Sequence, residues 1–463
     1  MTEFEVKDPA TGRTVGAVPD GGPAEAAAAV DAAAAAAREW SATPPRRRSE
    51  ILHRAFELMM SGRHRLASLI VAENGKAAAD AQAEVRYSAE FFRWYAEEAV
   101  RPAGAYGPSP AGGTRTVVTQ RPVGIAALVT PWNFPAAMAA RKIGPALAAG
   151  CTVVLKPAAE TPLTALALVR LLTEAGVPDG VVNIVTTTRA SSVVTAWMED
   201  PRVRKLSFTG STEIGRKLLR HAADRVVNVS MELGGNAPFI VTADADLDAA
   251  VDGAMVAKFR GGGQACTAAN RFYVHADVAE EFLSRFGKRV ATLRVGPGSD
   301  PRTDIGPLIN AEAVDSVTNL VDSALAAGAR VVAQAELPRG GTGHFFTPTL
   351  LADVPADAEI VQQEIFGPVA PVVTWTDEAA LLREVNGTEM GLAAYVYSGD
   401  LGQALRLGES IEAGMVGLNR GIVSDPSAPF GGVKQSGLGR EGAREGLHEF
   451  TETQYLSLAW PEV

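Results

Sequence analysis

The chain has 463 residues, 47% of them hydrophobic and 21% charged, which is the balance of a soluble globular protein long enough for two or three domains. Its formal net charge of −10 disfavours nucleic acid as a partner, and we expect neither a signal peptide nor a membrane partner, since no apolar run approaches the roughly 18 residues that a membrane helix requires. The two cysteines, Cys151 and Cys266, are too few and too far apart for a disulfide framework or a zinc site, so we expect a cytoplasmic protein without a metal.

The first hundred residues are predicted to be mainly helical. An alanine-rich helix begins at Pro23, a favoured first helical position, and runs to Trp40. A second helix follows residues 44–45 and places its apolar residues on one face. A third is predicted over 78–100, and a Gly/Pro-rich break over 101–113 follows it.

Strands and helices then alternate, beginning with β-branched runs at 114–120 and 123–129. Further strands are predicted at 151–155, 181–185 and 204–208, with helices between and after them at 162–176, 193–198 and 210–219. Such alternation predicts a doubly wound parallel sheet.

A second α/β unit is predicted to begin near Gly234. It has a strand at 236–241 and helices at 246–258, 274–290, 313–328 and 379–386. The final strand, 454–459, is expected to pair with 114–120 or with a neighbouring subunit, which would make an edge for oligomerisation.

Three segments of the first α/β unit place polar groups after predicted strands. Asn133 lies in a turn bracketed by prolines, where its amide is able to donate to an oxyanion; a purely rigid turn is the alternative. Lys156 follows a strand end, where nucleotides bind in doubly wound sheets, although a surface lysine fits equally well. Gly210 and Ser211 precede a helix whose free N–H groups suit a pyrophosphate.

Two later segments carry a carboxylate and a thiol. Glu232 stands at a strand end before two glycines, where it is able to accept a proton or to activate water; a solvated glutamate is the simpler interpretation. Three glycines shortly precede Cys266, and such a loop allows unusual dihedrals and close approach to a ligand. A thiol on this loop is a candidate nucleophile, and a free thiol in a flexible turn is the alternative.

Taken in order, and together with the segments 363–368 and 429–437, these motifs resemble the aldehyde dehydrogenase superfamily over nearly the full chain. The resemblance implies an α/β fold with two doubly wound parallel-sheet domains and a small β arm for oligomerisation. The implied units are a cofactor-binding domain (1–113 and 122–233), a catalytic domain (234–433), and an oligomerisation arm and tail (114–121 and 434–463). A homodimer or homotetramer is expected.

The resemblance also implies roles. Cys266 is the expected nucleophile, Glu232 the general base, and Asn133 the side-chain half of the oxyanion hole. The cofactor, NADP or NAD, is expected to contact Trp132, Lys156, Ala159, Gly210, Ser211, Leu233, Glu364 and Phe366. Glu232 also argues against the branch that passes the acyl group to coenzyme A, because the thioester is then hydrolysed by water.

Within the superfamily the chain is most similar to succinate-semialdehyde dehydrogenases. In that branch two arginines and a serine hold the distal carboxylate of the substrate, and they match Arg141, Arg260 and Ser424. Guanidinium groups suit carboxylates, although both arginines could instead form structural ion pairs. Glutarate semialdehyde, a neutral aldehyde, and a non-catalytic binding protein on this fold are the alternatives.

Several positions depart from the pattern of that branch. Gly261 replaces the usual asparagine, no second cysteine follows Cys266, and Arg420 stands where a small or acidic residue is common. Ala159 removes a carboxylate that would repel a 2′-phosphate, which favours NADP with NAD tolerated. The neighbouring Glu160 weakens this preference if its carboxylate turns toward the ribose.

Overall fold

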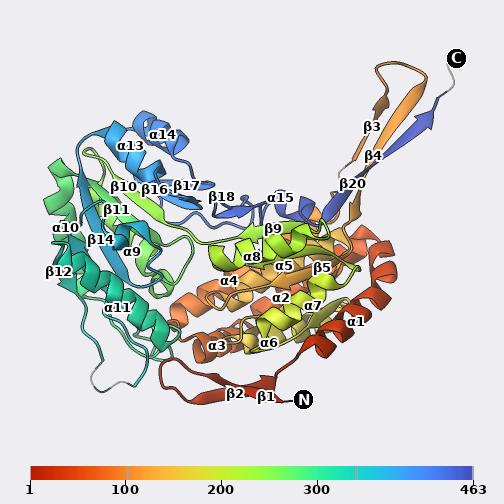
Figure 1. The fold of residues 1–463 in the computed structure, drawn as a ribbon, viewed down its shortest axis with the longest axis horizontal. Helices are drawn as coiled ribbons and strands as arrows, with labels where there is room; N and C mark the ends of the chain where they lie inside the picture. Colours follow the sequence, from red (N-terminus) through yellow and green to blue (C-terminus); the bar gives the residue numbers. More distant parts are fainter. Residues whose placement is uncertain (1, 102–103, 339, 341, 461–463) are drawn as a thin grey trace.

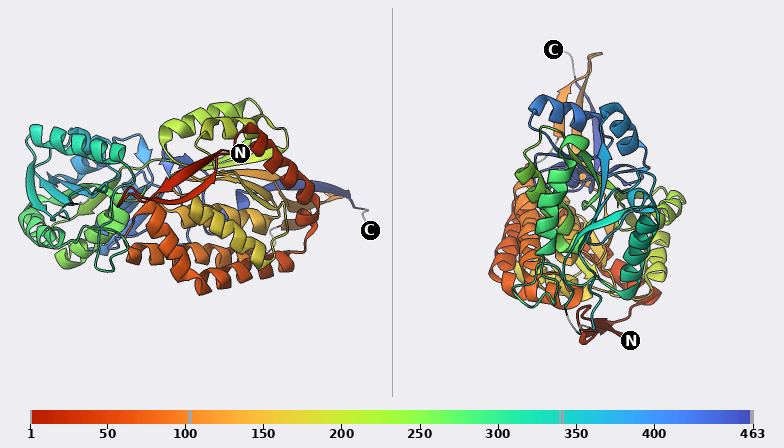
Figure 2. Two further views of the ribbon diagram at one scale, coloured as in Figure 1. Left: turned by 90° about the horizontal axis from the view of Figure 1, so that it is seen from below. Right: turned by 90° about the vertical axis from the view of Figure 1, so that its left-hand side faces the viewer.

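A computed structural model describes residues 2–101, 104–338, 340 and 342–460. It has two lobes and a projecting arm (Figure 1). One lobe contains a six-stranded sheet and the other a seven-stranded sheet. The arm leaves the molecule at the end opposite the seven-stranded lobe (Figure 2). The predicted α/β class, with two largely parallel sheets and a small β arm, is confirmed.

The six-stranded sheet has the order β19-β9-β8-β5-β6-β7, in which only β19 is antiparallel to its neighbour. Its strands are β5 (Ile125–Val129), β6 (Thr152–Lys156), β7 (Val182–Ile184), β8 (Val203–Thr209), β9 (Asn228–Glu232) and β19 (Gly437–Leu438). Side chains of β5 alternate between two cores, so that Leu128 packs on one face and Ala127 on the other. Burial on both faces is what a doubly wound sheet requires.

Helices supply both of these cores. The face that contains Leu128 is covered by α2 (Pro45–Ser61), α3 (Arg63–Asn74), α4 (Ala78–Glu98), α5 (Pro135–Ala149) and α6 (Pro162–Ala175). The other face is covered by α1 (Pro23–Ala42), α7 (Ala190–Glu199) and α8 (Thr212–Ala223).

The seven-stranded sheet has the order β12-β13-β14-β11-β10-β16-β17, with only β12 and β13 antiparallel. Its strands are β10 (Ala237–Val241), β11 (Ala269–His275), β12 (Arg330–Gln334), β13 (Thr349–Ala352), β14 (Val369–Trp375), β16 (Ala393–Tyr397) and β17 (Met415–Leu418). One face packs against α9 (Leu247–Phe259) and α10 (Ala276–Ala291). The other packs against α11 (Ala311–Ala326), α12 (Glu359–Gln362), α13 (Glu378–Asn386) and α14 (Leu401–Ser410).

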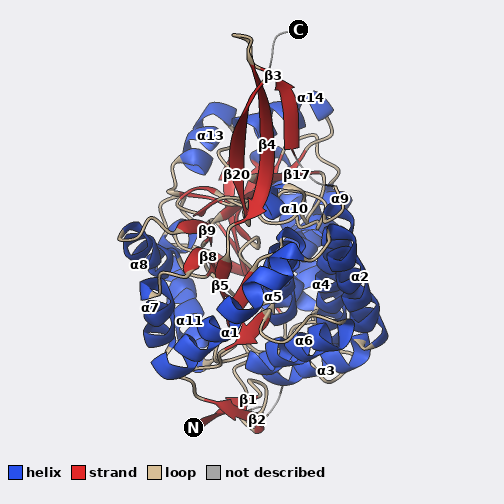
Figure 3. Ribbon diagram, turned by 90° about the vertical axis from the view of Figure 1, so that its right-hand side faces the viewer, coloured by secondary structure: helices blue, strands red, loops and turns tan. Residues whose placement is uncertain are grey.

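The arm is a three-stranded antiparallel sheet of β3 (Gly104–Pro108), β4 (Thr114–Pro122) and β20 (Thr451–Ala459). Figure 3 shows these three strands side by side. The predicted pairing of 454–459 with 114–120 is confirmed. Strand β3 lies in the segment predicted as a break, of which residues 102–103 are outside the described residues. Several large apolar side chains of the arm are exposed, among them Tyr106 and Tyr455.

After β17 the chain returns to the first lobe. β18 (Val433–Lys434) pairs with β15 (Met390–Gly391), β19 joins the six-stranded sheet, and α15 (Glu445–His448) packs against α5. The domain bounds given above remain predictions, and residues 1, 102–103, 339, 341 and 461–463 within them lie outside the described residues. Over the described ranges, no helix is both long enough and apolar enough to span a bilayer.

The N-terminal region differs most from the prediction. It begins with a hairpin of β1 (Glu3–Lys7) and β2 (Thr14–Pro19), because Val6 and Val18 are buried against the body of the protein. Such short strands carry only a weak alternation in sequence. The predicted start of the helix at Val274 is also wrong, since this residue belongs to β11 and pairs with β10 and β14.

Candidate active site

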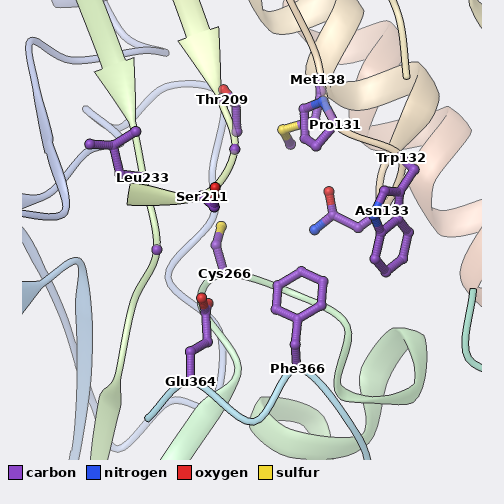
Figure 4. Close-up of a pocket in the computed structure, with 12 residues that line it drawn as sticks. Pro131, Trp132, Asn133, Met138, Thr209, Ser211, Leu233, Cys266, Glu364 and Phe366 are labelled. Carbon is purple, nitrogen blue, oxygen red and sulfur yellow. The ribbon is translucent and has the colours of Figure 1, made fainter. Parts of the chain in front are cut away.

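A cavity of about 250 Å³ lies where loops of the two lobes meet. Its walls come from the turn after β5, the ends of β8 and β9, the loop before β11 and the loop before β14. The lining residues are Pro131, Trp132, Asn133, Met138, Thr209, Gly210, Ser211, Leu233, Gly234, Cys266, Glu364 and Phe366. Figure 4 shows the Asn133 amide pointing into this cavity toward the Cys266 thiol.

The glycine run determines the shape of the Cys266 loop. Gly261, Gly262 and Gly263 have φ values of 62°, 68° and 76° in the 3₁₀ turn η1 (Arg260–Gly263), and side chains rarely adopt such backbone conformations. A Cβ on Gly263 would also lie 2.3 Å from the carbonyl oxygen of Gly367. These glycines therefore bring the loop against the segment that carries Glu364 and Phe366.

The Cys266 thiol is partly exposed to the cavity. Burial raises the pKa of Cys266 to about 12, against the opposing charge of Arg141. The thiol is therefore protonated at neutral pH in this state, and its nucleophilic form requires a base or an added positive charge. Cys151, by contrast, is fully buried and its sulfur donates to the carbonyl of Phe450, which is a structural role.

The side chain of Asn133 is held by a hydrogen bond to the loop that carries Cys266. Its Nδ2 donates to the carbonyl oxygen of Gln264 at 3.0 Å, and Gln264 is itself fixed by the backbone of Ile309 and Pro307. An amide NH2 has two hydrogens, so this bond fixes the amide orientation and leaves one N–H for a ligand.

Glu232 ends β9 and is only 2% exposed. Its Oε2 makes no hydrogen bond within the described part of the chain, and its side chain is not among those that line the cavity. Burial first, and the charge of Glu441 second, raise the pKa of Glu232 well above its usual range. Burial therefore favours the neutral form of this carboxyl group.

Behind Glu232 lies a buried charge cluster of Arg141, Lys142 and Glu441. Lys142 donates a hydrogen bond to Glu441, Arg141 forms an ion pair with the same carboxylate, and Arg141 also stacks on Phe430 at 4.0 Å. Burial alone would raise the pKa of Glu441, but Arg141 and Lys142 lower it below its usual range. The structure thus gives Arg141 an ion pair, and does not place it among the residues that line the cavity.

Arg260 has a different environment. Its guanidinium stacks over Phe134 at 5.5 Å, and no ion pair involves it among the described residues. Tyr87, a residue that the sequence analysis missed, lies near both arginines, and its buried hydroxyl has no partner in the described ranges. Ser424 is half-buried in the loop between β17 and β18, and it does not line the cavity.

The predicted cofactor residues divide into two groups. Trp132, Gly210, Ser211, Leu233, Glu364 and Phe366 all line the cavity. The ring of Phe366 meets that of Trp132 edge to face, with centroids 5.5 Å apart. Burial raises the pKa of Glu364 to about 7, and its Oε1 accepts a hydrogen bond from Gly235 at 3.3 Å.

Lys156 and Ala159 lie outside the lining of this cavity. Lys156 ends β6, which is the neighbour of β5 in the sheet, and burial lowers the pKa of Lys156. Ser211 caps α8 and accepts a hydrogen bond from Ile214, so the first N–H groups of α8 face the cavity side of the sheet. Backbone donors at a helix start, together with a carboxylate that is able to accept from ribose hydroxyl groups, form a set that fits a dinucleotide.

The sequence analysis missed Lys258. This lysine lies in the last turn of α9 and is fully buried. Its amine has no hydrogen-bond partner among the described residues. Burial lowers the pKa of Lys258 to about 7, against the opposing charge of Glu364. Lys258 precedes Cys266 by eight residues, but this spacing alone does not show that its side chain is buried.

The family model described as "Aldehyde dehydrogenase family" matches residues 1–456. A succinate-semialdehyde dehydrogenase of Paenarthrobacter nicotinovorans is 53% identical over 91% of this chain and 94% of its own length. Succinate-semialdehyde dehydrogenase (NADP(+)) GabD of Escherichia coli is 49% identical, over 98% and 94%. A glutarate-semialdehyde dehydrogenase of Pseudomonas putida is 47% identical, over 98% and 94%.

Solved structures share the fold. The crystal structure titled E. coli NADP dependent enzyme superposes with a TM-score of 0.97 at 48% identity, covering 99% of this chain and 95% of the other. The lobes and the arm therefore have the same arrangement in a protein solved by crystallography.

Proposed function

Since the chain belongs to the aldehyde dehydrogenase family, we propose that it oxidises a semialdehyde acid, foremost succinate semialdehyde, to the dicarboxylate with NADP or NAD. The observation that carries this proposal is the cavity in which Cys266, Asn133 and Glu364 face one another. This cavity contains the proposed nucleophile, the proposed oxyanion donor and the carboxylate proposed to bind a ribose. Non-catalytic binding would require none of this geometry.

The thiol of Cys266 gives up its proton to solvent, and the resulting thiolate attacks the aldehyde carbon and forms a carbon–sulfur bond. The carbonyl oxygen becomes an oxyanion, which is stabilised by the free N–H of the Asn133 amide together with the backbone N–H of Cys266. When bound, the oxidised nicotinamide supplies the acceptor for the hydride that leaves this carbon. The thioester that remains is hydrolysed, which regenerates the Cys266 thiol, so one aldehyde, one water and one oxidised cofactor give one carboxylic acid, one reduced cofactor and one proton.

Glu232 is the proposed base for the water. Burial raises the pKa of its carboxyl group, and the group acts as a base in its ionised form, after its proton has passed to solvent. Its backbone already contacts the site, because its carbonyl oxygen accepts a hydrogen bond from Gly210 and the next two residues line the cavity.

Arg260 is the proposed partner of the distal carboxylate. It begins the loop of Cys266, and a guanidinium without an ion pair retains its affinity for an anion. Arg141 and Ser424 are proposed to assist at longer range. The named relatives act on four-carbon and five-carbon semialdehyde acids, which leaves glutarate semialdehyde as the second candidate.

Ala159 supports a preference for NADP, as in the name of the Escherichia coli relative. A small side chain leaves room for a 2′-phosphate, and the buried Lys156 lies three residues earlier, at the end of β6. Ala159→Glu should lower the NADP/NAD ratio of kcat/KM about tenfold, through charge repulsion. An unchanged ratio would remove the proposed role of this position.

We further propose that the arm of β3, β4 and β20 joins copies of the chain into a dimer or tetramer. It extends beyond the lobes and exposes Tyr106, Tyr455, Leu456 and Leu458, and exposed apolar strands favour association. Light scattering after size exclusion tests this, and a monomer at micromolar concentration would contradict it. A reducing compartment, the cytoplasm, is proposed from the two unpaired cysteines.

The test of the function is a panel of initial rates. Succinate semialdehyde, glutarate semialdehyde and neutral butanal are each measured with NADP and with NAD, and product acid is identified by mass spectrometry. We expect the highest kcat/KM for succinate semialdehyde. Faster oxidation of butanal would overturn the proposed substrate class, and no oxidation of any aldehyde would overturn the activity.

A further inference from the structure

One short segment, residues 74–84, contacts the backbone of the Asn133 turn at several points. Lys76 Nζ donates to the carbonyl oxygen of Asn133 at 2.7 Å, and the same amine lies 4.0 Å from the centre of the Phe134 ring. Asn74 Nδ2 donates to the carbonyl oxygen of Trp132 at 3.0 Å. The turn is therefore held by side chains of residues that lie 57 and 58 positions earlier in the chain than their partners.

Glu84 completes this arrangement. Its Oε2 forms an ion pair with Lys76 at 2.6 Å, and its Oε1 accepts hydrogen bonds from the first turn of α5, from the N–H groups of Ala136 and Ala137. Lys76 and Glu84 are 3% and 2% exposed. A buried ion pair with every charge hydrogen-bonded keeps a single geometry, because any displacement leaves a charge unpaired in a low dielectric.

The same segment also reaches the Cys266 loop. Asp80 Oδ2 accepts a hydrogen bond from the backbone N–H of Gly261 at 2.8 Å. Residues 74–84 therefore bind the turn that presents the Asn133 amide and the loop that presents the thiol. None of these side chains lines the cavity.

We propose that the buried pair Lys76–Glu84 positions Asn133, fixing the distance and angle between its amide and the oxyanion that forms at Cys266. The inference rests on the proposed roles of Cys266 and Asn133. Oxyanion donors are effective only when they are fixed before the reaction, and a misplacement near 1 Å can reduce the rate roughly a hundredfold. Lys76 and Glu84 are thus positioning residues rather than catalytic ones.

The test uses an activated ester, 4-nitrophenyl acetate, with the full-length protein. Acylation of Cys266 by this ester passes through a tetrahedral oxyanion and needs neither aldehyde nor cofactor, so its outcome does not depend on the identity of the substrate. The variants are Lys76→Met/Glu84→Gln, which removes both charges together, Asn133→Ala, and the combination of all three substitutions. The burst of nitrophenolate gives the acylation rate.

We expect the pair variant to acylate about 10- to 100-fold more slowly in the presence of Asn133. In the Asn133→Ala background the pair substitution should reduce the rate by less than about threefold, because its effect acts through the missing amide. A purely structural role would give equal losses in both backgrounds and would overturn the inference. So would an unchanged rate in the pair variant.

Glu73→Gln is the matched control. Glu73 is also a buried carboxylate that accepts from a helix start, from the N–H groups of Leu163 and Thr164 in α6, but α6 does not directly follow the Asn133 turn as α5 does. The acylation rate of Glu73→Gln should stay within about threefold of the unmodified protein. Its stability should fall, as it does when a side chain that accepts from the first N–H groups of a helix is replaced. If the pair variant does not fold, Glu84→Gln replaces it in the same cycle. A normal burst in Asn133→Ala would instead overturn the oxyanion role, and with it this inference.

Discussion

The buried charge cluster and the Cys266 loop use their arginines in opposite ways. In the cluster, Arg141 and Lys142 both bind Glu441. On the loop, Arg260 stacks on an aromatic ring and has no ion pair in the described part of the chain. Paired charges in the first region stabilise the interior behind Glu232, whereas the unpaired charge in the second remains available to an anion. Two arginines that the sequence treats as equivalent therefore have different roles to be tested.

The largest effect is expected on the loop itself. Cys266→Ala should reduce NADPH formation at least about a thousandfold, because Cys266 is the only thiol among the described residues that line the cavity. Cys151→Ala is the control, and its initial rate should stay within about twofold of the unmodified protein, since a small buried thiol acts as an apolar group. If Cys266→Ala kept more than about a tenth of the turnover rate of the unmodified protein, Cys266 would not be the nucleophile.

In the cluster the largest effect should be on stability. Glu441→Ala leaves two buried cations without a partner and should lower the free energy of unfolding by about 3–5 kcal/mol. Arg260→Met should lower it by about 1 kcal/mol or less, because no ion pair is lost. Urea unfolding followed by tryptophan fluorescence measures both values, and equal losses would remove the contrast between the two regions.

The thiol should show the effect of its environment on pH dependence. The pKa of Cys266 is raised to about 12. At any pH well below that value, raising the pH by one unit increases the thiolate fraction tenfold. The rate of alkylation by iodoacetamide in Cys151→Ala protein should therefore rise roughly a hundredfold between pH 7 and pH 9. A plateau below pH 9 would show that the thiol is already ionised, and that the loop supplies more positive charge than Arg141 and Arg260 provide.

Arg260 should determine selectivity rather than the chemical step. Arg260→Met should reduce kcat/KM for succinate semialdehyde about 10- to 100-fold, which corresponds to the loss of charge-assisted hydrogen bonds. Butanal should be affected less than about threefold, because it has no carboxylate to bind. Arg302→Met, a change on the exposed surface of the second lobe, is the control. Equal losses for both aldehydes would show that Arg260 has a structural role and does not bind the distal carboxylate.

Much of the site follows from local sequence. The three glycines before Cys266 require left-handed backbone conformations that the structure contains, and the order of the motifs identified the family. Asn133, Glu364 and Phe366 were predicted at the site and line one cavity with Cys266. The N-terminal hairpin and the strand at Val274 were missed, because strands of five to seven residues depend on partners that are distant in the chain.

The sequence by itself identified the groups that we propose to take part in the chemistry, since each motif is a short run whose backbone and side-chain types are fixed locally. Only the tertiary structure decided which charges are paired. Lys142 meets Glu441 across 299 residues, and Lys76 meets the Asn133 carbonyl across 57. No local pattern encodes such contacts, because the energy of a buried charge depends on what the fold places beside it rather than on its neighbours along the chain.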